Sequence, residues 1–218
     1  MKKILLISPH PDDIEIWMGA TAARLVSENN AVRSIIITDG RRSPRSIPIT
    51  DAEMASIRAQ ESQAAHQALG ITDIQQYSLP SIADETIVRA IIQKELDKNF
   101  DEIYLPHPHD GHKTHARIAD LVLEAAGTHP TPAVLWAYDG WNFLHNPTRY
   151  EEISAYLSQK LDAIRCHKSQ IADKAYDEAM EKFARVRALL MSSHTVTNAQ
   201  YIEAFTQLDA QAYRKNCI

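Results

Sequence analysis

The segment SPHPDD, residues 8–13, places one imidazole and two carboxylates within a single turn of chain. It follows the apolar run 1–7, and ligands in open α/β sheets gather at the carboxyl ends of such strands. His10 and Asp13 are expected there, where they would suit Zn²⁺ or Fe²⁺, while Asp12 could stay free as a base. The alternative is that the two aspartates only charge the first turn of the following helix, where acidic side chains favour the dipole.

A second cluster of histidines favours the metal site. His107, His109, His112 and His115 fall within nine residues, a crowding that rarely serves a hydrophobic core. The stretch follows a strand-like run at 102–105 and precedes a helical pattern, so His112 and His115 would share one face at the helix entry. Exposed loop histidines are the alternative, but two such clusters at two strand ends predict a metal site.

The two motifs, Pro9-His10-Pro11-Asp12-Asp13 and Gly111-His112-x-x-His115, resemble those of the LmbE-like (PIG-L) zinc-dependent N-deacetylases. The resemblance spans almost the whole chain. Further matching segments are Gly19-Ala20-Thr21, Thr38-Asp39-Gly40, Arg58-x-x-Glu61 with Ala65 and Leu69-Gly70, Leu105-Pro106-His107, Lys160-x-x-Ala163-Ile164-x-x-His167-x-Ser169-Gln170, and Glu203-Ala204-Phe205.

The chain departs from the family pattern at three places. The family usually has Gly-Gly where this chain has Gly19-Ala20, and an acidic residue commonly follows Asp-Gly where this chain has Arg41-Arg42. An aspartate is also common after the third strand, where this chain has Ser81 and only a later Asp84. These departures concern substrate contacts and not the metal ligands.

The resemblance implies a role for each motif residue. His10, Asp13 and His115 would hold Zn²⁺, with Fe²⁺ as the alternative, and leave positions open for water and for the acetyl oxygen. Asp12 would be the general base. His112 would reach the tetrahedral intermediate and protonate the departing amine.

Substrate contacts are expected from three further residues. Arg58 matches a family arginine and is interpreted as substrate-binding, the alternative being an i,i+3 pair with Glu61. Trp141 follows the fifth strand and could stack on a sugar ring, with burial as the alternative, while Asp139 could bind hydroxyls.

The other histidines and their neighbours carry weaker expectations. His107 and His109 are interpreted as loop residues or as hydrogen-bond partners that orient a ligand. No mechanism follows for His167, Ser169 and Gln170. Structural or exposed positions are expected for His66, His129, His145 and His194.

Composition agrees with a cytoplasmic enzyme of one α/β domain, and the resemblance implies a single LmbE-like domain over residues 1–218. Hydrophobic content of 44% and charged content of 23% are globular values, and a net charge of −5 argues against a nucleic-acid or anionic-membrane surface. Cys166 and Cys217 are expected to be reduced thiols. The N-terminal apolar run is too short for a signal peptide, and no stretch is long enough to span a bilayer.

Strand-like runs alternate with helical patterns through the first two-thirds of the chain, which predicts a Rossmann-like, mainly parallel sheet flanked by helices. The final third is predicted to be a helical C-terminal region. The expected strands are 3–8, 32–38, 74–78, 102–105 and 133–137, and the expected helices are 16–28, 51–69, 84–99, 114–126, 149–163, 171–191 and 198–208. The absence of a Gly-x-Gly-x-x-Gly turn argues against dinucleotide binding.

The favoured function is a metal-dependent hydrolase that removes the acetyl group from an N-acetylated amino sugar, such as an N-acetylglucosamine glycoside or conjugate. Two alternatives stay open: a deacylase of a non-sugar N-acyl metabolite, and a non-catalytic metal-dependent sugar or nucleotide binder. A pure binder would need neither Asp12 nor His112 beside its metal. The expected partner is a small acetamido sugar, and the C-terminal region could also supply an interface between copies of the chain.

Overall fold

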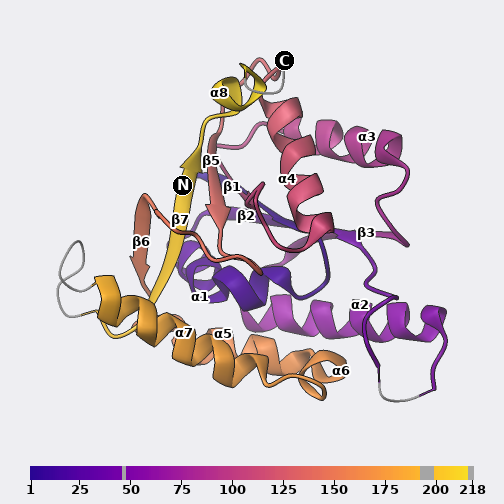
Figure 1. Cartoon of the computed structure of the whole chain (residues 1–218), viewed down its shortest axis with the longest axis vertical. Helices are drawn as coiled ribbons and strands as arrows, with labels where there is room; N and C mark the ends of the chain where they lie inside the picture. Colours follow the sequence, from indigo (N-terminus) through magenta and orange to yellow (C-terminus); the bar gives the residue numbers. More distant parts are fainter. Residues whose placement is uncertain (46–47, 192–198, 216–218) are drawn as a thin grey trace.

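One mixed sheet of seven strands, in the order β3-β2-β1-β4-β5-β7-β6, forms the centre of the computed structural model (Figure 1). The structure describes residues 1–45, 48–191 and 199–215; His194 and Cys217 lie outside them. The first five strands are parallel and agree with the predicted strands to within one residue at each end. They are β1 Lys3–Ser8, β2 Ala31–Thr38, β3 Asp73–Leu79, β4 Glu102–Pro106 and β5 Val134–Tyr138.

Helices cover both faces of the sheet (Figure 1). The crossover helices are α1 Asp13–Ser27, α2 Asp51–Ala68, α3 Glu85–Leu96 and α4 Lys113–Ala126. Side chains of β1 alternate between two hydrophobic clusters: Ile4 and Leu6 pack on the side of α1 and α2, and Leu5 and Ile7 on the side of α3 and α4. Because the five strands β1–β5 are parallel, their carboxyl ends all lie at one edge of the sheet.

The C-terminal third is only partly helical, which corrects the prediction. The predicted helix at 149–163 begins as strand β6 Arg149–Glu152, and most of the predicted helix at 198–208 is strand β7 Ile202–Leu208; residue 198 lies outside the described part of the chain. Both strands are antiparallel to their neighbours. The remaining elements are η1 Ser154–Tyr156, α5 Leu157–Cys166, α6 Lys168–Ile171, α7 Tyr176–Met191 and α8 Ala210–Lys215.

Glu203 of β7 connects to α1, the helix that follows the first motif, by hydrogen bonds, and to α5 by a buried ion pair. Met18 departs from helical geometry (φ −144°, ψ 22°). Just after this break, the backbone N–H groups of Ala20 and Thr21 donate to the Glu203 carboxylate at 3.2 and 2.8 Å. Glu203 also accepts from the buried Lys160 ammonium at 2.7 Å. These contacts give a structural role to three of the family-like segments.

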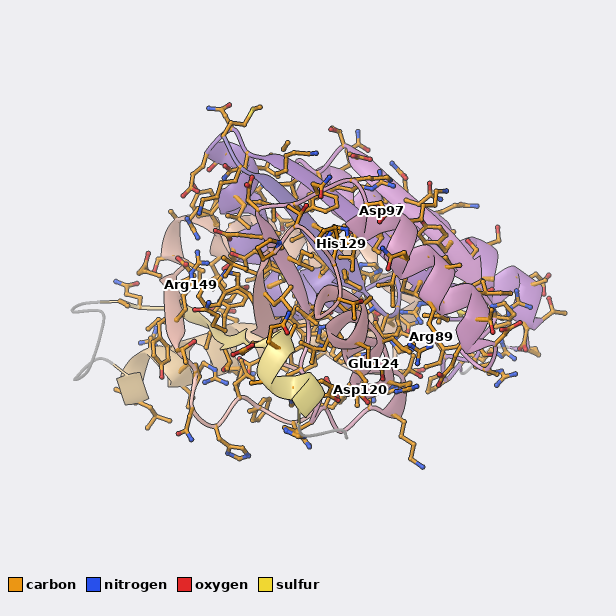
Figure 2. The ribbon with its side chains drawn as sticks, turned by 90° about the horizontal axis from the view of Figure 1, so that it is seen from above. Arg89, Asp97, Asp120, Glu124, His129 and Arg149 are labelled. Carbon is orange, nitrogen blue, oxygen red and sulfur yellow. The ribbon has the colours of Figure 1, made fainter. Side chains whose placement is uncertain are left out.

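Ion pairs join α3 and α4 on the outer surface. Figure 2 shows Arg89 of α3 beside Glu124 of α4, and the two side chains approach to 2.6 Å. Nearby, His129 packs 3.5 Å from Asp97. Exposed pairs of this kind contribute about 0–1 kcal/mol each, so the buried clusters hold the layers together. Among the described helices, none combines the length and the apolar character needed to cross a bilayer.

Candidate active site

The first motif forms the turn between β1 and α1. The carbonyl of Pro9 accepts from the Thr38 backbone N–H at 3.0 Å and from its hydroxyl at 2.8 Å, which ties the turn to the end of β2. The His10 backbone N–H donates to Asp13 Oδ2 at 2.7 Å. Both motif aspartates are thus fixed at the first turn of α1, at the carboxyl edge of the sheet.

Three predicted ligands converge at this edge. His10 Nδ1 lies 3.0 Å from His115 Nε2. Asp13 Oδ2 lies 3.3 Å from His10 Nδ1, and Asp13 Oδ1 lies 3.2 Å from His115 Nε2. Metal bonds of about 2.1 Å in a tetrahedral site separate the ligand atoms by about 3.4 Å. The donor set therefore fits a divalent metal ion.

Electrostatics support the same set. Burial alone would lower the pKa of His115, but the carboxylates of Asp13 and Asp110 outweigh it and raise that pKa to about 10. Burial alone would raise the pKa of Asp13, but His115 and His10 hold it well below its usual value. The three donors thus interact strongly, and a metal ion bound here would have to displace any proton carried by His115 Nε2.

Asp110 orients His115 and was missed by the sequence analysis. Its Oδ2 lies 3.1 Å from His115 Nδ1, which assigns the ring proton to Nδ1 and directs the Nε2 lone pair at the other donors. A Cβ on Gly140 would overlap the Asp110 carboxylate, so this approach requires glycine. The rule that a metal-binding histidine donates its second ring N–H to a carboxylate could have identified Asp110 within the histidine-rich segment.

His112 lies beside the three donors at the N-cap of α4 and lines the cleft. The donor atoms of His10, His112 and His115 all lie within 4.8 Å of one another, so a fourth ligand position is within its reach. His112 Nδ1 accepts from the Thr114 backbone N–H at 3.3 Å, which leaves the proton of a neutral ring on Nε2. Burial, with help from His10 and His115, lowers the pKa of His112. This environment favours a neutral hydrogen-bond donor over a protonated acid.

Asp12 is held by Arg58. Arg58 Nη2 lies 2.6 Å from Asp12 Oδ1, and Arg58 Nη1 donates to Ser43 Oγ at 2.5 Å. The expected alternative partner of Arg58, Glu61, instead accepts from the backbone and hydroxyl of Ser169 at 2.7 Å each, which corrects the i,i+3 interpretation. Among the described residues, none hydrogen-bonds Asp12 Oδ2, and Asp12 lines the cleft.

Gly40 makes room for this arginine. It adopts φ +65°, and a Cβ there would overlap the Arg58 guanidinium. Arg58 is only 3% exposed, and its guanidinium already contacts Asp12. The predicted contact of Arg58 with substrate would have to form beside this ion pair. The direct role of the arginine is to position the carboxylate.

The two residues expected to bind sugar after β5 have different surroundings. Trp141 is 44% exposed, lines the cleft and packs edge to face against Trp17, with ring centroids 5.9 Å apart. Asp139 is buried, pairs with Arg187 at 2.5 Å and accepts from the Leu144 backbone at 2.8 Å. It does not line the cleft, and these contacts make it a residue that positions the loop after β5 rather than a sugar ligand.

Two of the remaining histidines, His107 and His66, have contacts that define their roles. His107 Nε2 contacts the Asn142 carbonyl at 2.6 Å, which positions the loop that carries Trp141. His66 is fully buried between Glu15, at 2.8 Å, and the Ser34 hydroxyl, also at 2.8 Å, as expected for a structural residue. The site opens into a cleft of about 750 Å³, large enough for a sugar and an attached group.

The protein is an α/β protein whose site can hold a metal ion. Its sheet is mostly parallel, and histidine and aspartate donors converge at the carboxyl ends of the strands. The sequence model of one family, PIG-L (GlcNAc-PI de-N-acetylase), matches residues 5–126, more than half of the chain. The chain belongs to this family.

Individual proteins agree with that assignment. The chain is 27% identical over 217 residues to a diacetylchitobiose deacetylase of Thermococcus kodakarensis, covering 89% of this chain and 80% of that one. The fold is shared with an N,N'-diacetylchitobiose deacetylase from Pyrococcus horikoshii (TM-score 0.82, 23% identity, 97% and 85% of the chains). It is also shared with a 4-carboxy-2-hydroxymuconate hydratase from Pseudomonas putida (TM-score 0.81, 19% identity, 96% and 97%).

Proposed function

We propose that the protein hydrolyses the acetamide of an N-acetylated amino sugar in a metal-dependent reaction. The observation that carries this proposal is the Asp12 carboxylate, whose Oδ2 has no hydrogen-bond partner among the described residues, beside three donors spaced for a metal ion. Membership of a de-N-acetylase family and the likeness to a diacetylchitobiose deacetylase support the amino-sugar substrate. A fold shared with a hydratase supports only the fold, so the site must decide the chemistry.

His10, Asp13 and His115 would hold the ion, and zinc is the default for two imidazoles and one carboxylate, with Fe²⁺ as the alternative. When bound, such an ion would supply Lewis-acid polarisation of a carbonyl and would lower the pKa of a water molecule to about 7. Asp110 keeps His115 in the tautomer that ligation requires.

Asp12 is the proposed proton carrier. Arg58 holds its Oδ1 at 2.6 Å, which leaves Oδ2 to accept the proton of the attacking water. Amide nitrogen leaves poorly without a proton, and Asp12, once protonated, can return that proton to the amine. One carboxylate thus serves as base and then as acid. This division of labour replaces the expectation that His112 protonates the amine.

His112 is the proposed hydrogen-bond donor to the acetyl oxygen. The contact from the Thr114 N–H to Nδ1 leaves the Nε2 proton of the neutral ring available. A donor that is already in place when negative charge develops on the oxygen stabilises the transition state, with a typical effect of 10²–10³ in rate. Asp110 positions this residue as well, because its Oδ1 accepts from the His112 backbone N–H at 2.7 Å.

A screen of purified protein tests the proposed function. Protein loaded with Zn²⁺ or Fe²⁺ is incubated with N-acetylglucosamine, diacetylchitobiose, N-acetylglucosaminides and N-acylated non-sugar amines, and free amine is quantified. We expect metal-dependent amine release from at least one acetamido sugar and little from the non-sugar amides. Release only from the non-sugar amides would favour the other deacylase hypothesis, and tight sugar binding without release would favour the binder. A cytoplasmic location and the assembly state remain predictions.

A further inference from the structure

The cleft is cationic although the chain as a whole is acidic. Its lining contains four cationic side chains, Arg41, Arg42, Arg58 and Lys174, against two acidic ones, Asp12 and Asp13, whereas the chain has a net charge of −5. The excess of positive charge is therefore specific to this surface. A concave surface with one sign of charge concentrates ligands of the opposite sign.

Two of the four cations are already engaged. Arg58 is buried against Asp12 at 2.6 Å. Arg41 forms an ion pair with the buried Asp39 at 2.5 Å, and Asp39 also accepts from its backbone N–H at 3.0 Å. Their charges are balanced by protein carboxylates, so neither needs an anionic ligand.

Arg42 and Lys174 differ from this pair. Both are exposed, and within the described part of the chain neither forms an ion pair. They come from different segments, Arg42 from the loop after β2 and Lys174 from the connection between α6 and α7. The Lys174 ammonium lies over the ring of Trp141, 5.1 Å from its centroid, and 5.9 Å from that of Tyr176. This contact holds the charge beside an exposed aromatic ring in the cleft wall.

We infer that the substrate is an acidic acetamido sugar, one that carries a carboxylate or phosphate group bound by Arg42 and Lys174. The inference rests on the proposed function, because the acetamide must reach the site of His10, Asp12 and Asp13. Those two carboxylates would repel an anionic substrate, and Arg42 and Lys174, which form no ion pair with any described residue, would offset that repulsion. A cleft of about 750 Å³ has room for the sugar and its charged substituent.

The test compares matched substrates with metal-loaded protein. One is an N-acetylglucosaminide whose aglycone ends in a carboxylate, the second is its methyl ester, and the third is N-acetylglucosamine 1-phosphate. We expect kcat/KM for the carboxylate or the phosphate to exceed that of the ester by about tenfold at low salt, and the ratio to fall as salt screens the charges. The third substrate distinguishes a phosphate from a carboxylate ligand.

Charge variants locate the effect. Arg42→Gln and Lys174→Gln should each lower the acid-to-ester ratio about threefold, mainly through KM of the acid. Lys94→Gln removes the same charge from an exposed position on α3 outside the cleft and should leave the ratio unchanged. Equal efficiency for acid and ester, or a ratio that neither cleft variant changes, would overturn the inference while leaving the proposed function intact. Failure to release amine from any of the sugars would overturn the proposed function itself.

Discussion

Replacing Asp12 by asparagine separates the chemistry of the site from its stability. The amide is nearly isosteric and keeps one oxygen that can accept from Arg58, but it cannot take a proton from water. General-base catalysis typically contributes 10²–10⁴ in rate, so kcat should fall by at least about 10², which corresponds to about 2.7 kcal/mol in the activation free energy. The ligands His10, Asp13 and His115 are untouched, so metal content should stay at the wild-type value.

The same change has a structural cost that follows from the burial of Arg58. The arginine is 3% exposed, and asparagine leaves its charge without a carboxylate at 2.6 Å. We expect the free energy of unfolding to fall by about 1–3 kcal/mol, less than a typical total of about 5–15 kcal/mol, so the variant still folds. Adding Arg58→Met removes the unpaired charge and should restore part of this stability without restoring kcat.

The assay combines amine release, metal analysis and urea unfolding on the wild type, Asp12→Asn and the double variant. Near-normal turnover by metal-loaded Asp12→Asn would refute the assignment of the base and move it to a neighbouring histidine. An equal recovery of stability and of kcat in the double variant would show that the loss of activity was structural.

Two further predictions concern His112 and Glu95. His112→Ala should keep its metal and should lower kcat by about 10² both for an acetamido sugar and for an activated acetyl ester, measured in parallel. A much smaller loss of kcat on the ester would instead indicate that His112 protonates the departing amine. Glu95 is buried, and although burial raises its pKa, Arg33 at 2.7 Å and Tyr77 at 2.5 Å outweigh this and lower the pKa from 4.5 to about 2. The stabilisation from ionised Glu95 is present above pH 4.5 and is lost as the pH falls towards 2. Glu95→Gln should therefore lower the free energy of unfolding in urea by about 2–3 kcal/mol at pH 7 and by little at pH 2. The same loss of unfolding free energy at both pH values would contradict the lowered pKa.

The parallel half of the fold could be predicted because four of its five strands, β1, β2, β4 and β5, contain short apolar runs bounded by polar turns. The exposed edge strand β3 is half polar and is predicted from its place in the alternation of strands and helices. β7 could not be predicted in the same way. Its apolar residues Ile202, Phe205 and Leu208 recur at helical spacing, and glutamate and alanine are good helix formers. It forms a strand because it pairs between β5 and β6, and its Glu203 contacts α1 across the fold. Tertiary pairing of this kind leaves no local pattern.

The candidate ligands could be predicted because they sit in two short motifs at strand ends, which a parallel sheet brings together. The partners of the site residues could not. Asp12 and Arg58 are far apart in sequence, and their contact requires that residue 40 has no Cβ, which would overlap the guanidinium. An aspartate at position 139 could equally well bind the hydroxyls of a sugar. Its actual partner, Arg187 on α7, is far away in the sequence, so their buried ion pair could not be predicted.

The most direct test of the central claim is a titration of metal-free protein with Zn²⁺ or Fe²⁺ while amine release from an acetamido sugar is measured. Activity should be absent without metal, rise in proportion to the metal bound, and level off at about one ion per chain. His10→Ala, Asp13→Ala and His115→Ala should each lose the bound ion by elemental analysis and stay inactive. Amine release by metal-free protein, or retention of one ion per chain by all three variants, would contradict the claim.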